Sequence, residues 1–262
     1  ASCSPFLYSQ ILKEKRWLLD IIDDKNFNIL SLLEHLKPEP FDTLYLKLRK
    51  AKKRAALWVA LNDLAGVWSL EAVTKNLSVF AEKAINLSWH ASFRKELNKG
   101  KFPTHYHLDP DGVGFFILAM GKLGAYELNY SSDIDLICFF DEDLYSPEEF
   151  QNVRRTFINA TKNLYRVLNE NGKDGYVFRT DLRLRPDPSV TPVCMGVDAA
   201  ERYYASLGRT WERAAFIKAR VCAGDHSAGN KFLKNIEPFI WRKYLDYTAI
   251  SDAHDIRLRI RD

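Results

Sequence analysis

Two long stretches in the first hundred residues carry apolar side chains at helical spacing. Residues 41–65 contain one apolar stripe, and basic side chains fill many of the remaining positions. Gly66 interrupts the pattern, and Ser69 suits the N-cap of a second striped segment that reaches about Leu87. We expect two long helices packed as an antiparallel hairpin, with one or two further helices in residues 4–37.

After Gly100 the pattern becomes typical of buried strands. Residues 113–120 form a continuous apolar run bounded by glycines, which predicts a strand covered on both faces. Residues 134–140 form a second run of the same kind. A glycine-containing turn at residues 121–124 follows the first of these strands.

Helical periodicity returns in residues 148–168 and stops at Asn171 and Gly172, which predicts a crossover helix. Residues 175–184 then alternate, with apolar side chains on one face and charged side chains on the other, as in a strand. From Asp198 onward the pattern is helical again.

These patterns predict an α+β protein with three regions. A helical region at 1–100 precedes a mixed α/β core at 101–196, and a helical region at 197–262 follows the core. The first residue is not Met, and the last helical pattern stops at Asp262 without a capping signal. We therefore expect a fragment of a longer protein, truncated in its last region.

Composition and charge agree with a globular protein and argue against nucleic acid as a partner. Charged residues make up 27% of the chain, but the net charge is only +4, so any attraction to polyanions requires local clustering. The one basic run, residues 47–54, lies on the striped helix and is best interpreted as its solvated flank.

The cysteines and the hydropathy pattern indicate the cellular compartment to expect. Four cysteines lie far apart, without the spacing of a zinc site, and three of them fall in apolar runs. This favours buried, reduced thiols and a cytoplasmic protein. No apolar stretch approaches the roughly 18 residues of a membrane span, and no signal peptide is evident, so we expect no membrane association.

Three aspartates are the strongest candidates for chemistry. Asp133 and Asp135 are separated by one residue at the start of a predicted strand, so their side chains share one face. Asp181 lies on the charged face of the third predicted strand, which can pair beside the second. Taken singly, the first two also fit a solvated strand end, and Asp181 fits a salt bridge to its neighbouring arginines. Together, they favour a site for divalent cations, because Mg²⁺ prefers hard oxygen ligands.

Residues upstream supply groups suited to phosphate. Gly121 and Gly124 permit close backbone approach, Lys122 brings a positive charge, and Ser131 and Ser132 bring hydrogen-bond donors. The spacing is not that of a Walker motif. Strand, glycine turn, serines and three carboxylates in this order predict nucleotidyl transfer at a site with two metal ions.

Four segments resemble the bacterial glutamine synthetase adenylyltransferase and adenylyl-removing enzymes. They are residues 120–137 (MGKLGAYELNYSSDIDLI), 176–186 (YVFRTDLRLRP), 208–213 (GRTWER) and 217–220 (IKAR). The resemblance covers about residues 42–262. Two departures from the family's usual wording occur, at Ala125, where a second glycine is usual, and at residues 187–192, where a glycine-containing turn is usual.

The resemblance implies a nucleotidyltransferase core of the DNA polymerase β-like superfamily. It implies that Asp133, Asp135 and Asp181 ligate Mg²⁺ at two sites, with Mn²⁺ as an alternative ion. It further implies that the phosphate-binding residues are Gly121, Lys122, Gly124, Ser131, Ser132, Arg183 and Arg185.

The same resemblance implies a reaction and its partners. Enzymes of this family carry two such domains, one that attaches AMP from ATP to a tyrosine of glutamine synthetase and one that removes it with phosphate, giving ADP. The wording of residues 208–220 is closer to the N-terminal, removing copy. The implied partners are glutamine synthetase, nucleotide, phosphate and, in the full-length enzyme, a PII-type signal protein. Two alternatives stay open: the adenylylating half, and a regulatory nucleotide-binding module without turnover.

Overall fold

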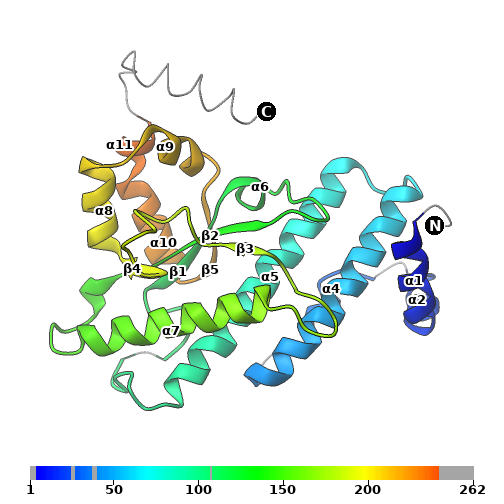
Figure 1. The fold of residues 1–262 in the computed structure, drawn as a ribbon, viewed down its shortest axis with the longest axis horizontal. Coiled ribbons are helices and arrows are strands. Elements are labelled where there is room, and N and C mark those ends of the chain that lie inside the picture. Colours follow the sequence, from blue (N-terminus) through cyan, green and yellow to red (C-terminus); the bar gives the residue numbers. More distant parts are fainter. Residues whose placement is uncertain (1–3, 25–26, 37–39, 107, 242–262) are drawn as a thin grey trace.

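The computed structural model describes residues 4–24, 27–36, 40–106 and 108–241. Within these residues, helices cover both faces of a small mixed sheet (Figure 1). The α+β class predicted from the sequence is confirmed. The expected uncapped ending at Asp262 lies outside the described residues, as does Cys3.

The helices of the N-terminal part follow the predicted pattern closely. Helices α4 (Phe41–Leu64) and α5 (Leu70–Leu97) form the expected hairpin. The Ser69 hydroxyl accepts a hydrogen bond from the Ala72 amide at 3.3 Å, so Ser69 is the N-cap of α5. Three shorter helices precede them: α1 (Pro5–Lys13), α2 (Lys15–Ile21) and α3 (Ser31–Glu34).

Five strands form the sheet. They are β1 (Phe115–Ala119), β2 (Ile134–Phe140), β3 (Thr180–Asp181), β4 (Cys194–Gly196) and β5 (Arg220–Gly224). Strand β1 lies between β2 and β5 and is antiparallel to both, whereas β3 and β4 pair with β2 in parallel. The crossover helix that permits this parallel pairing is α7 (Phe150–Asn169), as predicted.

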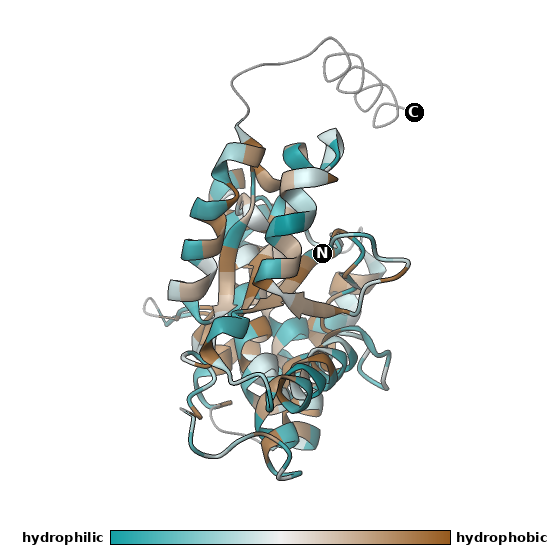
Figure 2. Ribbon diagram, turned by 90° about the vertical axis from the view of Figure 1, so that its left-hand side faces the viewer, coloured by the Kyte–Doolittle hydropathy of each residue, from teal (hydrophilic) through white to brown (hydrophobic). Residues whose placement is uncertain are grey.

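Strand β1 is buried on both faces, which confirms its prediction from a continuous apolar run. Phe115, Ile117 and Ala119 face a core shared with α4, α5 and α7. Phe116 and Leu118 face a second core, built with the C-terminal helices. Figure 2 shows the strands as apolar ribbons between more polar helices.

The third predicted strand is much shorter than its alternating pattern suggested. Pairing with β2 lasts only through Thr180 and Asp181 and resumes at Cys194. Between the aligned pairs Asp135–Asp181 and Cys138–Cys194, β2 advances three residues and its partner advances thirteen. The residues between β3 and β4 therefore leave the sheet as an excursion.

The expectation of helices alone after Asp198 is wrong. Helices α8 (Val197–Ser206) and α9 (Thr210–Phe216) are followed by strand β5, and only then by α10 (His226–Asn235) and α11 (Glu237–Ile240). Residues 221–224 are buried, and a short apolar run of this kind does not distinguish strand from helix by its periodicity. The sheet thus continues beyond residue 196, where the sequence placed the end of the core.

The basic flank of α4 is only partly solvated. Arg49 is buried, lies 3.5 Å from the ring centroid of Tyr45, and donates to the carbonyl oxygens of Tyr45 at 2.6 Å and Gly175 at 2.8 Å. It also donates to the Glu170 carbonyl. The interpretation as a solvated flank is therefore wrong for this residue, which ties α4 to the connection between α7 and β3.

Two other expectations concern cysteines and membranes. Cys138, Cys194 and Cys222 are buried and free, and burial raises the pKa of Cys138 to about 12, so its thiol stays protonated at neutral pH. Among the described residues, no helix combines the length and hydropathy that a membrane crossing requires.

Candidate functional site

The three aspartates lie near one end of the β2–β3 pair. The parallel register aligns Ile134 with Thr180 and Asp135 with Asp181. Ile134 and Thr180 are buried beneath the sheet, so the alternation of side chains turns the aspartates toward the opposite face. Asp133 precedes β2 by one residue and shares the face of Asp135. The predicted convergence of these carboxylates thus follows from strand register.

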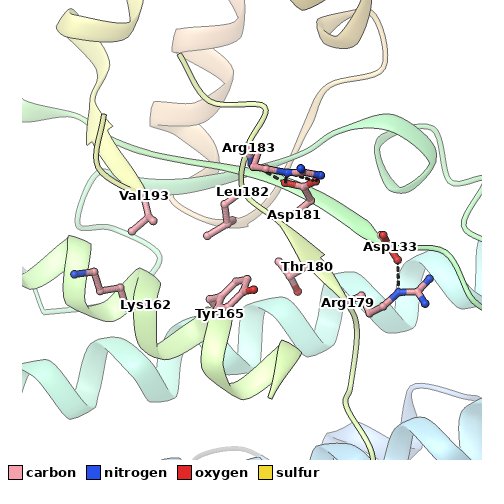
Figure 3. A pocket seen from close by; sticks show the side chains of 9 residues that line it. All are labelled: Asp133, Lys162, Tyr165, Arg179, Thr180, Asp181, Leu182, Arg183 and Val193. Atoms are coloured by element: carbon pink, nitrogen blue, oxygen red, sulfur yellow. Dashed lines mark hydrogen bonds and ion pairs between the residues drawn. The ribbon is translucent and has the colours of Figure 1, made fainter. Parts of the chain in front are cut away.

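Two arginines from the β3 segment bind the outer carboxylates (Figure 3). The Arg179 Nε donates to Asp133 Oδ1 at 2.5 Å, and its Nη2 donates to the Ser131 carbonyl at 2.6 Å. Arg183 contacts both oxygens of Asp181, at 2.9 and 3.0 Å through Nε and at 2.6 Å through Nη2. The Arg183 amide also donates to Asp181 Oδ1 at 2.8 Å.

The inner carboxylate, Asp135, lacks such a partner among the described residues. Burial raises its pKa, and the negative charges of Asp181 and Asp133 raise it further. The pKa of Asp181 is lowered instead, chiefly because it accepts hydrogen bonds from the Arg183 side chain. The site therefore places its least compensated negative charge at its centre.

A hollow of about 800 Å³ lies in front of these carboxylates. Gly121 lines it with a φ of +53°, and a Cβ at this position would lie 2.9 Å from Asp135 Oδ2. Only glycine combines this backbone with this close approach. Gly121 begins α6 (Gly121–Gly124), a single helical turn where the sequence predicted a turn, and Lys122 is exposed beside it.

The predicted serines lie at the rim of the same hollow. The Ser132 hydroxyl accepts from the Asn129 amide at 3.2 Å, and the Ser132 amide donates to the Asn129 carbonyl at 3.2 Å. Ser131 is exposed, and its carbonyl is held by Arg179. A second hollow of about 480 Å³ continues past Asp133 and Arg179 to Asp181 and Arg183.

Two predicted residues do not line either hollow. Gly124 is buried, donates its amide to the Met120 carbonyl at 3.0 Å, and packs its Cα against the Lys218 carbonyl. Arg185 donates to the carbonyls of Leu182 at 2.7 Å, Pro188 at 2.9 Å and Thr191 at 3.1 Å, and so braces the excursion between β3 and β4.

The sequence reasoning missed several residues that line the hollows. Arg179 is the most prominent, because it contacts Asp133 and lines both hollows. Its position two residues before Asp181 on an alternating segment was a usable signal. Asn129 and Tyr130 line the first hollow, and Lys162 and Tyr165 of α7 line the second. The helix gave no signal, because its exposed polar face resembles any solvated surface.

The donor set fits a hard divalent cation, although its side chains are not arranged as ready ligands. In the described part of the chain, no three acidic, histidine or cysteine side chains gather as a metal cluster. The reason is visible in the ion pairs, since arginines hold Asp133 and Asp181. Both pairs are at least partly exposed, with Arg183 82% exposed, so breaking them would cost little free energy.

The sequence is similar to those of known proteins. The sequence matches the model of the glutamate-ammonia ligase adenylyltransferase family over residues 1–235. Relatives named bifunctional glutamine synthetase adenylyltransferase/adenylyl-removing enzyme occur in Bradyrhizobium sp. strain BTAi1, Rhodopseudomonas palustris strain BisB5 and Caulobacter vibrioides. Their identities to this chain are 42% over 269 residues, 41% over 268 and 45% over 235.

These alignments cover 100%, 100% and 88% of this chain. They cover 27%, 27% and 24% of the relatives, so the chain spans about a quarter of their length. The family model and the identity across the whole chain both lead to one assignment. The chain belongs to the glutamate-ammonia ligase adenylyltransferase family.

Proposed function

We propose that this chain is a nucleotidyltransferase domain that removes AMP from adenylyl-tyrosine of glutamine synthetase by phosphorolysis, giving ADP. The observation that carries the proposal is the register of β2 and β3, which sets Asp181 opposite Asp135 and beside Asp133. The glycine turn and the serine rim lie in front of this group. The names of the relatives support glutamine synthetase as the protein substrate.

The fold supports the same class of chemistry. An antiparallel β1–β2 pair carries two carboxylates, and a parallel β3 supplies a third, as expected for a DNA polymerase β-like core. We propose that the described sheet with α5, α6 and α7 is such a core. The boundaries predicted at residues 100 and 196 remain predictions.

In the proposed reaction, an oxygen of inorganic phosphate attacks the α-phosphorus of adenylyl-tyrosine. A new phosphorus–oxygen bond forms, the bond to the tyrosine oxygen breaks, and the phenoxide leaves and takes up a proton. Lys122 and Arg179 line the hollow beside Asp133 and Asp135, and both would supply positive charge to an incoming phosphate there. Phosphate is already an anion at neutral pH, so orientation and charge stabilisation supply most of the catalysis.

We propose Mg²⁺ as the ion held by Asp133, Asp135 and Asp181, with Mn²⁺ able to replace it. When bound, two such ions neutralise charge on the attacking and leaving oxygens. The raised pKa of Asp135 agrees with the proposal, because burial and the nearby charges of Asp181 and Asp133 disfavour its negative form, and a bound cation would offset both. With such ions bound, Arg179 and Arg183 would no longer be needed to neutralise Asp133 and Asp181 and could contact phosphate oxygens.

The test combines an assay of direction with one of metal binding. Adenylylated glutamine synthetase, Mg²⁺ and phosphate are mixed with the chain, and we expect ADP together with unmodified glutamine synthetase. Transfer of AMP from ATP to unmodified glutamine synthetase would instead assign the adenylylating half. Nucleotide binding without either product would assign a regulatory module.

Asp133→Asn and Asp135→Asn test the proposed metal site separately from the direction of AMP transfer. We expect each change to lower the rate by about 10²-fold or more, because it removes a charged ligand. We also expect Mg²⁺ to raise the melting temperature of the wild-type chain but not that of Asp135→Asn. Full activity in both variants would refute the metal site. A PII-type protein as a partner of the complete enzyme is a separate proposal, tested by pull-down with the full-length relative.

A further inference from the structure

A third hollow of about 670 Å³ lies against α4 and opens beside the candidate active site. Ala56 and Ala60, one turn apart on α4, line it together with Leu64 of α4 and Phe6 of α1. The exposed fractions of Phe6 and Leu64 are 63% and 67%. Apolar side chains this large and this exposed, arranged around a concavity, are typical of a binding site.

Two lysines that line this hollow, Lys52 and the exposed Lys173, have no anionic partner among the described residues. Lys53 pairs with Asp174 at 2.6 Å, and Asp63 accepts from the Tyr130 hydroxyl at 2.8 Å, so these three charges are satisfied. Lys52 forms no hydrogen bond or ion pair with any described residue. Its Nζ lies 4.0 Å from the centroid of the Phe178 ring. Burial lowers its pKa to about 8, so the ammonium group is costly in the free protein.

The hollow is continuous with the candidate active site. Tyr130 and Ser131 line both this hollow and the one in front of Asp133 and Asp135. An occupant that fills the apolar hollow therefore lies next to whatever reacts at the carboxylates. An extended peptide spans about 3.3 Å per residue, so a few residues are enough to join the two hollows.

We propose that this hollow binds the segment of the protein substrate that flanks the modified tyrosine, through an apolar side chain on Ala56 and Ala60 and a carboxylate at Lys52. The choice of occupant rests on the proposed function. The need for an apolar, acidic segment rests on the apolar lining and the unpaired ammonium group.

The first experiment measures binding without turnover. A fluorescent twelve-residue peptide of alternating leucine and glutamate is titrated with the 262-residue chain and followed by anisotropy. We expect Lys52→Met to weaken binding by about tenfold, since it removes one charge-assisted contact. Lys50→Met removes the same charge from an exposed position of α4 outside the hollow and is expected to change little.

The melting temperatures of the same variants show whether weaker binding results from loss of the folded structure. We expect Lys52→Met to melt at or above the wild-type temperature, because burial disfavours the ammonium and no described carboxylate pairs with it. A lower melting temperature would show that the ammonium has a stabilising partner and would overturn the argument. Equal binding by Lys52→Met, equal binding of a leucine–lysine peptide, or competition by AMP would overturn it as well.

The second experiment separates docking from chemistry. With adenylylated glutamine synthetase, we expect Lys52→Met to raise KM and leave kcat near the wild-type value. With free O-adenylyl-tyrosine, which lacks the flanking peptide segment, we expect no change in either constant. If the wild-type chain turns over neither substrate, the proposed function fails, and the peptide titration alone decides whether the hollow binds an acidic apolar segment.

Discussion

At the scale of single residues, the two glycines of α6 have different surroundings. A Cβ on Gly124 would lie 2.0 Å from the Lys218 carbonyl oxygen and 2.7 Å from that of Ala119. A Cβ on Gly121 would meet only the Asp135 carboxylate, at 2.9 Å, on a backbone with φ of +53°. Gly124 thus serves packing, and Gly121 serves the site.

We expect Gly124→Ala to destabilise the fold by about 3 kcal/mol or more, because both clashes are with backbone. Gly121→Ala should cost only about 1–2 kcal/mol, the cost of an alanine in the left-handed region, yet abolish most activity by displacing Asp135. Urea unfolding and the ADP assay distinguish the two. Equal losses of stability would contradict the assignment of roles.

The sequence predicted the three aspartates as a group, and the strand register aligns Asp181 with Asp135, two residues along the chain from Asp133. Their joint role as a site remains a prediction. The sequence did not distinguish Gly121 from Gly124. The close contact of Gly124 with a carbonyl 94 positions away has no signal in the neighbouring residues. The family resemblance placed Arg185 at the phosphate site together with Arg183. The excursion after Leu182 removes it from that face, and the carbonyls that it binds belong to the excursion itself.

At the scale of elements, Arg49 joins a helix to a loop. It supplies donors to the carbonyls of Glu170 and Gly175 in the connection between α7 and β3. We expect Arg49→Met to destabilise the protein by about 3 kcal/mol, since buried carbonyls lose their donors. Arg54→Met is the control: Arg54 pairs with Glu14 at 2.7 Å in a half-buried position and should cost about 1 kcal/mol or less.

The midpoint of urea denaturation, monitored by circular dichroism, measures both changes. If Arg49→Met matched Arg54→Met, the buried hydrogen bonds would carry no more free energy than a half-buried ion pair. Periodicity predicted α4, α5 and α7 well because each has a long apolar stripe. It failed for β3 and β5, whose lengths are set by pairing partners far along the chain.

At the scale of the whole molecule, the sheet joins segments that the sequence had assigned to different regions. Strand β5 pairs with β1, and the second core draws on β1, β2 and the C-terminal helices. A chain of residues 1–196 would lose β5 and uncover Phe116 and Phe139. We expect it to lack a cooperative thermal transition, whereas the 262-residue chain should show one.

Scanning calorimetry and near-ultraviolet circular dichroism of both chains check this expectation. A sharp transition in the shorter chain would restore residue 196 as a true boundary. The order of the strands explains why the sequence alone did not reveal that β5 belongs to the same sheet as β1. The edge position of β5 beside β1 depends on a pairing between residues about a hundred positions apart.

The excursion between β3 and β4 has a consequence for how this chain tolerates changes in length. Both strands pair with β2 on the same edge, so the alignment on either side is fixed independently of the residues between them. We expect insertions or deletions in this excursion to leave the residue pairs between β2 and its two partners unchanged. This stretch is the natural location for a grafted epitope or a reporter dye close to the aspartates, provided that Arg185 keeps its carbonyl partners.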